Sequence, residues 1–126
     1  MKTAWYIDKD KNIIQITRLM LKLVEYEMRS FSNAHDTAQA LLAGERPDII
    51  ILDINAQEEL GIDLLEFVRK RKNLNPIPVI MLASENGDDQ FQQAISAGAD
   101  GFVLKPIMLD DLENTIQNAI EKRVNL

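Results

Sequence analysis

Five short apolar runs alternate along the chain with stretches whose apolar residues recur every three or four positions. The runs are AWYI (4–7), MRSF (28–31), IIILDI (49–54), VIMLA (79–83) and GFVL (101–104). The third and fourth runs are continuous, which is typical of strands covered on both faces, whereas helical spacing is typical of amphipathic helices. The MRSF run is the most polar and is expected to be an edge strand.

The intervening stretches are predicted as helices. They are expected around 13–24, 35–43, a stretch that starts after Gly61, 88–97 and 112–120. Such alternation of strands and helices predicts an α/β fold, in which right-handed crossovers join parallel strands. We expect one domain over residues 1–126, built as a doubly wound five-stranded parallel sheet of order 2-1-3-4-5, with helices on both faces. This arrangement is flavodoxin-like.

Composition excludes several classes of function. The formal net charge of −6 argues against direct contact with nucleic acid, and the basic run 69–72 is expected to be a solvated helix end. The chain has no cysteine, which excludes disulfides, thiolate metal sites and thiol nucleophiles. Its apolar runs are too short to span a bilayer. A soluble, cytoplasmic protein is therefore expected.

Acidic and basic side chains follow the strands at the edge where ligands usually bind. In an open doubly wound sheet this is the carboxyl end, at the point where strand order reverses, here between the first and third strands. Asp8 follows the first strand, Asp53 ends the third, and Lys105 follows the fifth. Each residue alone is more often structural, but two carboxylates and a lysine together suit phosphoryl chemistry and Mg²⁺ binding.

These residues resemble those of the receiver domain of two-component response regulators. The segment PDIIILDINAQEELGIDLLEFVR (47–69) is similar to the family's phosphoacceptor segment, with Asp53 followed eight positions later by Gly61. The segment PVIMLASENGDDQFQQAISAGADGFVLKP (78–106) is similar to the family's fourth- to fifth-strand region and ends on its Lys-Pro pair. The resemblance extends over essentially the whole chain.

The resemblance implies a role for each matching position. Asp53 would accept a phosphoryl group from a histidine kinase or phosphotransfer protein, and Mg²⁺ would be held by Asp8, Asp53 and the backbone carbonyl of Asn55. Lys105 would bind the phosphoryl oxygens, and its bond to Pro106 is expected to be cis.

Two further positions are those at which the family changes conformation on activation. They are Ala83 and Phe102. The family also implies that an output domain or downstream protein binds the region from the fourth helix to the fifth strand. The domain would be a switch and not an enzyme.

The sequence departs from the family pattern at several positions. Lys9 stands where the principal metal-ligating acid is expected, and Asp10 is one position too far along. Ala83 replaces the usual Ser or Thr, for which Ser84 is only a weak substitute because adjacent strand residues face opposite sides. Gln57 replaces a proline. We hypothesise that Lys9 pairs with Asp53 or Asp8 and weakens Mg²⁺ binding.

Two alternatives remain at this point. The first is an atypical receiver that acts as a phosphorylation-independent interaction module. The second is a small phosphatase, because YIDKDKN (6–12) resembles the opening motif of the haloacid dehalogenase type, with Asp8 as nucleophile and Asp10 as general acid. Asn12 and the short chain fit that family poorly.

Overall fold

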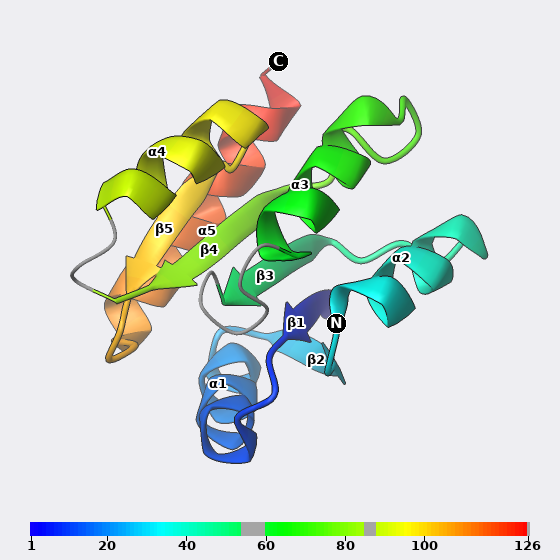
Figure 1. The fold of residues 1–126 in the computed structure, drawn as a ribbon. Coiled ribbons are helices and arrows are strands. Elements are labelled where there is room, and N and C mark those ends of the chain that lie inside the picture. Colours follow the sequence, from blue (N-terminus) through cyan, green and yellow to red (C-terminus); the bar gives the residue numbers. More distant parts are fainter. Residues whose placement is uncertain (54–59, 85–87, 126) are drawn as a thin grey trace.

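The computed structural model describes residues 1–53, 60–84 and 88–125, with the backbone alone at 60, 61 and 88–90 (Figure 1). Its five strands form one sheet of order β2-β1-β3-β4-β5, in which every neighbouring pair is parallel. The predicted fold class and strand order are confirmed, and β2 lies at an edge as expected. In the part of the chain that is described, no helix is both long and apolar enough to cross a membrane.

The elements follow the predicted order. The strands are β1 (Lys2–Ile7), β2 (Tyr26–Phe31), β3 (Ile49–Asp53), β4 (Val79–Ala83) and β5 (Gly101–Leu104). The helices are α1 (Lys11–Leu23), α2 (Ala34–Leu42), α3 (Leu60–Lys70), α4 (Asp88–Ala97) and α5 (Leu109–Val124). Several bounds differ from the sequence-based expectation. The strands β1 and β2 each begin two residues before their apolar runs, α3 includes Gly61 instead of starting after it, and α5 is longer at both ends than the predicted 112–120.

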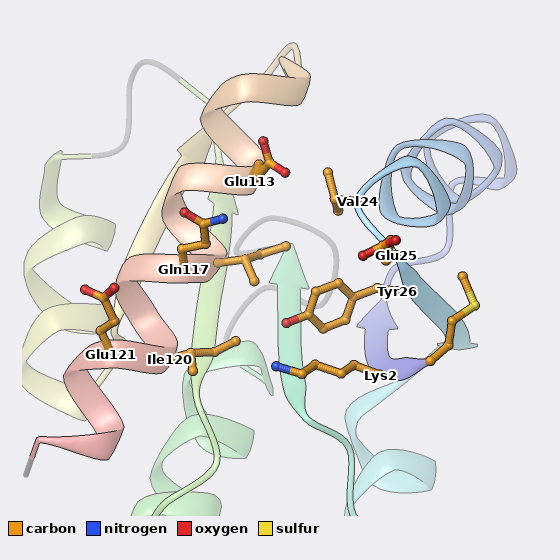
Figure 2. A pocket seen from close by; sticks show the side chains of 10 residues that line it. Lys2, Val24, Glu25, Tyr26, Glu113, Gln117, Ile120 and Glu121 are labelled. Carbon is orange, nitrogen blue, oxygen red and sulfur yellow. The ribbon is translucent and has the colours of Figure 1, made fainter.

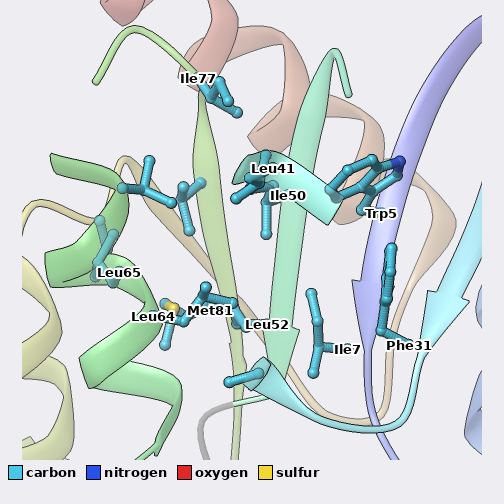
Figure 3. Close-up of a cluster of buried hydrophobic side chains, with 14 of the residues drawn as sticks. Trp5, Ile7, Phe31, Leu41, Ile50, Leu52, Leu64, Leu65, Ile77 and Met81 are labelled. Atoms are coloured by element: carbon cyan, nitrogen blue, oxygen red, sulfur yellow. The ribbon is translucent and has the colours of Figure 1, made fainter. Parts of the chain in front are cut away.

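The core has two layers, one on each face of the sheet. Helices α2, α3 and α4 cover one face, where Leu41, Leu65 and Ala94 pack with Trp5 and Ile50 of the strands. Figure 3 shows Leu41, Leu65, Trp5 and Ile50 in this cluster. Helices α1 and α5 cover the other face. There the buried residues include Leu21, Leu112 and Ile116 from the helices and Tyr6 and Ile51 from the strands. Because both faces are covered, β3 and β4 are buried along their whole length.

Helix ends are fixed by local side-chain and backbone chemistry. Asp10 caps α1, because its carboxylate accepts hydrogen bonds from the N–H groups of Asn12 and Ile13. Gly44 and Gly98 follow α2 and α4 with positive φ angles of 102° and 107°, a conformation that glycine adopts without strain.

A buried ionic cluster joins α3 and α5 to the amino ends of β4 and β5. Asp100 Oδ2 accepts from Arg69 Nη2 at 2.7 Å and from the Val79 N–H at 2.9 Å. Asp100 Oδ1 accepts from Arg123 Nε at 2.7 Å. The Asp100 side chain is 0% exposed, and those of the two arginines are 10% and 11% exposed. The cluster therefore lies at the end of the sheet opposite Asp53.

Candidate functional site

Asp8 and Asp53 both lie at the carboxyl end of the sheet, as the sequence predicts. Asp8 directly follows β1, and Asp53 is the last residue of β3. The two strands are neighbours, with Ile7 in register with Leu52, so both carboxylates project from adjacent strand ends. Both residues are buried, with exposed fractions of 4% for Asp8 and 3% for Asp53. A buried carboxylate is costly unless hydrogen bonds or a cation compensate its charge. Both residues therefore require partners at the carboxyl end of the sheet.

The cation that pairs with Asp53 is Lys105. Its Nζ atom contacts Asp53 Oδ2, and the lysine side chain is 29% exposed. Lys105 follows β5, and β4 lies between β5 and β3, so the lysine reaches across the end of β4. Its backbone N–H donates to the Ala83 carbonyl at 2.9 Å, and the Lys105–Pro106 bond is cis as expected.

Asp8 is held by three donors of its own segment. Oδ2 accepts from the Tyr6 hydroxyl at 2.5 Å, while Oδ1 accepts from the N–H groups of Lys9 at 2.7 Å and Asp10 at 3.1 Å. Burial raises the pKa of Tyr6, and its hydrogen bond to Asp8 raises that pKa further. The phenol therefore keeps its proton and remains a donor at neutral pH.

Lys9 and Asp10 do not enter the site in the expected way. Among the described residues, no ion pair joins Lys9 to Asp8 or Asp53, so the pairing part of that hypothesis is wrong, whereas the weakening of Mg²⁺ binding by Lys9 stays a prediction. Lys9 is exposed and gives Asp8 only its backbone N–H. The carboxylate of Asp10 caps α1, so the residue that the phosphatase hypothesis needs as a general acid serves the helix instead.

The remaining predicted positions are placed as follows. Ala83 is fully buried at the end of β4, and Ser84 beside it is exposed. Phe102 is half-buried and packs edge-on against Phe91 of α4, with ring centroids 4.9 Å apart. Asn55 and Gln57 lie outside the described residues.

Tyr6 is the site residue that the sequence reasoning missed. The signal was present, because Tyr6 and Asp8 are two positions apart on an extended segment and so face the same side. Tyr6 was counted only within an apolar run.

A separate groove lies between the end of α1, the start of β2 and α5 (Figure 2). The residues that line it include Val24, Tyr26 and Ile120, and Glu25 and Glu113 are among its acidic residues. Because β2 starts here, the groove belongs to the amino end of the sheet and not to the Asp53 site.

Comparison with known proteins identifies the family. Residues 5–117 match the response regulator receiver domain. The chain belongs to this family. The receiver domain is 30% identical over 119 residues to the chemotaxis protein CheY of Pseudomonas aeruginosa, and the match covers 94% of this chain and 95% of CheY. It is thus a receiver domain of the two-component type, consistent with phosphorelay signalling.

Other relatives are partial or structural matches. The chain is 36% identical over 66 residues to the two-component response regulator ORR2 of Oryza sativa subsp. indica, and the match covers 52% of this chain and 26% of ORR2. A putative response regulator from Chloroflexus aurantiacus has the same fold, with a TM-score of 0.87, 22% identity and coverage of 95% and 98% of the two chains. For CheY4 of Vibrio cholerae the TM-score is 0.81, at 26% identity and 94% and 98% coverage.

Receiver domains typically bind Mg²⁺ at the phosphorylation site, and the described residues here do not fit that ion well. Mg²⁺ requires near-octahedral oxygen coordination and is usually bound through one or two carboxylates. Within the described ranges, no group of three or more His, Cys, Asp or Glu residues is placed to hold a metal. Asp8 is occupied by internal donors, Asp53 is paired with Lys105, and Lys9 adds a positive charge.

Proposed function

We propose that Asp53 is the phosphoacceptor of this receiver domain. The observation that carries the proposal is the buried Asp53 carboxylate at the carboxyl end of β3, with the Lys105 ammonium against it. A carboxylate oxygen attacks the phosphorus of a phosphohistidine, the P–N bond breaks, and the imidazole leaves with the electron pair and takes up a proton. The product is an aspartyl phosphate on Asp53.

Lys105 stabilises that product. The ammonium that neutralises the Asp53 carboxylate transfers its interaction to the phosphoryl oxygens, which carry more negative charge. Lys105 is 29% exposed, so its side chain has room for this shift. The donor is a histidine kinase or phosphotransfer protein, and the domain acts as a switch without turnover of a substrate.

Intact-mass spectrometry tests the role of Asp53. We expect the wild-type domain, incubated with excess acetyl phosphate, to gain a single phosphoryl group slowly and with little dependence on Mg²⁺. The reason is that three internal donors already occupy the Asp8 carboxylate and Lys9 adds a positive charge beside it. The Asp53→Asn variant is expected to gain none. A prompt, stoichiometric adduct that requires Mg²⁺ would contradict the atypical metal site, and an adduct that persists in Asp53→Asn would contradict the acceptor assignment.

A phosphorylation-independent interaction module is the second candidate. It is favoured by the occupied Asp8 carboxylate and by the ion pair that already neutralises Asp53. Complete absence of an adduct, together with partner binding that is unchanged in Asp53→Asn, would establish this candidate over the first.

The region from α4 to β5 is proposed as the surface for an output domain or downstream protein. Large apolar side chains are exposed there, with exposed fractions of 54% for Ile95 and 44% for Leu104, and Met108 just beyond β5 is 63% exposed. Large apolar side chains that are exposed in the free protein can become buried in a complex.

Substitution of this surface is expected to weaken partner binding. The double variant Ile95→Ser/Leu104→Ser should bind the downstream protein about tenfold or more weakly, because it removes apolar area that becomes buried in the complex. Isothermal titration calorimetry measures the change. Leu42→Ser is the matched control, since Leu42 is 63% exposed on α2. An equal loss of affinity in the double variant and in Leu42→Ser would contradict this assignment of the surface.

The proposal also includes a cytoplasmic location and no direct contact with nucleic acid. The absence of cysteine suits a reducing compartment, and the net charge of −6 disfavours binding to a phosphate backbone.

A further inference from the structure

The Tyr6 hydroxyl occupies one oxygen of the carboxylate that a metal ion would need. Tyr6 is 0% exposed, and its ring is part of the buried cluster between the sheet and α1 and α5. The buried ring fixes the position of its oxygen, which lies 2.5 Å from Asp8 Oδ2. A short hydrogen bond to an ionised carboxylate is a strong one.

The other oxygen of Asp8 is also engaged. Oδ1 accepts from two consecutive backbone N–H groups, those of Lys9 and Asp10. An ionised carboxylate offers about four lone-pair positions, of which these donors and Tyr6 use three. The fourth lone pair is on Oδ2, so a divalent cation there would share with the Tyr6 proton an oxygen whose residue is only 4% exposed.

We propose that Tyr6 is a specificity-determining residue that disfavours divalent cations at Asp8 by holding its Oδ2 atom in a hydrogen bond. The inference concerns the proposed phosphoacceptor site and rests on that proposed function for its biological meaning. Its physical content is independent of phosphorylation: the hydroxyl satisfies the buried Asp8 charge that a metal ion would otherwise balance. The Asp53–Lys105 pair does the same for the second carboxylate.

Binding of Mn²⁺, followed by the electron paramagnetic resonance signal of the free ion, tests the proposal without a phosphodonor. We expect Tyr6→Phe to bind Mn²⁺ about tenfold more tightly than the wild type, which corresponds to the loss of one competing hydrogen bond to a charged group. The Tyr26→Phe variant is the matched control, because Tyr26 is the chain's other tyrosine, is also buried, and begins β2. It should bind as the wild type does.

A double variant traces the effect to Asp8. In Tyr6→Phe/Asp8→Asn the gain in Mn²⁺ affinity should disappear, because the carboxylate that the hydroxyl restrains is absent. Unchanged or weaker binding in Tyr6→Phe alone overturns the proposal, and so does a gain that survives the Asp8→Asn change.

A measurement on the wild type keeps the proposal testable if Tyr6→Phe does not fold. Tyrosine labelled with ¹³C at Cζ gives one signal each for Tyr6 and Tyr26. We expect both signals to stay in place as Mg²⁺ is added to millimolar concentration. A Tyr6 shift that saturates at low Mg²⁺, with Tyr26 unmoved, overturns the proposal. Failure of Asp53 phosphorylation would overturn the proposed function and leave both metal readouts unaffected.

Discussion

Replacement of Asp100 by alanine is expected to lower the free energy of unfolding by about 3–5 kcal/mol, the usual cost of removing one partner from a buried ionic cluster. Asp100 is the anion shared by Arg69 and Arg123, and it also accepts the Val79 N–H at the start of β4. Arg69 belongs to α3 and Arg123 to α5, which lie on opposite faces of the sheet. Removal of the Asp100 carboxylate therefore affects the packing on both faces.

The size of this effect follows from the charges that remain. Burial lowers the pKa of Arg69 to about 10, against the raising effect of Asp100, so its guanidinium is still charged at neutral pH. Without Asp100, two largely buried guanidinium groups would face each other without a counter-charge, and the Val79 N–H would lose its acceptor. Arg69 also donates hydrogen bonds to the carbonyls of Gly98 and Ile77. These bonds hold the guanidinium in its position even when Asp100 is absent.

Urea unfolding followed by circular dichroism measures this change. Asp111→Ala is the matched control, because Asp111 is an exposed aspartate in the first turn of α5, and its loss should cost less than about 1 kcal/mol. Asp100→Asn should fall between the two, since it keeps an acceptor and loses the charge. A loss below about 1 kcal/mol in Asp100→Ala would show that the cluster contributes little.

Replacement of Lys9 by aspartate is expected to tighten Mg²⁺ binding on the order of a hundredfold. The change exchanges a repelling charge for an attracting one beside Asp8, worth a few kcal/mol near a protein surface. A domain that binds Mg²⁺ only when folded gains about 1.4 kcal/mol of stability at ten times its Kd. Without Mg²⁺ the variant should be less stable than the wild type, because three carboxylates then converge at one edge.

Thermal unfolding with and without 10 mM Mg²⁺, a concentration on the order of ten times a millimolar Kd, measures this effect. The wild type should show little Mg²⁺ dependence, and Lys9→Asp a clear increase in Tm. Lys11→Asp makes the same charge change two positions away, at the exposed start of α1, and is the matched control. Equal responses in Lys9→Asp and Lys11→Asp would mean that Lys9 has no special place at the site.

The outcome for the basic run 69–72 illustrates the limit of sequence patterns. Lys70, Arg71 and Lys72 are exposed as predicted, yet the Arg69 side chain is only 10% exposed and pairs with Asp100. The partners of Arg69 are distant in sequence, with 31 positions separating it from Asp100. A local pattern contains no information about such a partner.

The sequence by itself determined the order of strands and helices and the edge at which Asp8, Asp53 and Lys105 meet. The reason is that hydrophobic periodicity is a local property, and the carboxyl ends of parallel strands converge at one edge whatever their side chains. For Asn55, the role remains a prediction, because the residue lies outside the described ranges.

Only the tertiary structure decided which groups pair at that edge. Lys105 and not Lys9 contacts Asp53, because the lysine after β5 reaches across the end of β4 while the side chain of Lys9 is exposed. The carboxylate of Asp10 caps α1, and Asp8 turns to the buried Tyr6 hydroxyl. Side-chain direction and burial depend on how elements pack, and residues that are adjacent in sequence can therefore have unrelated partners.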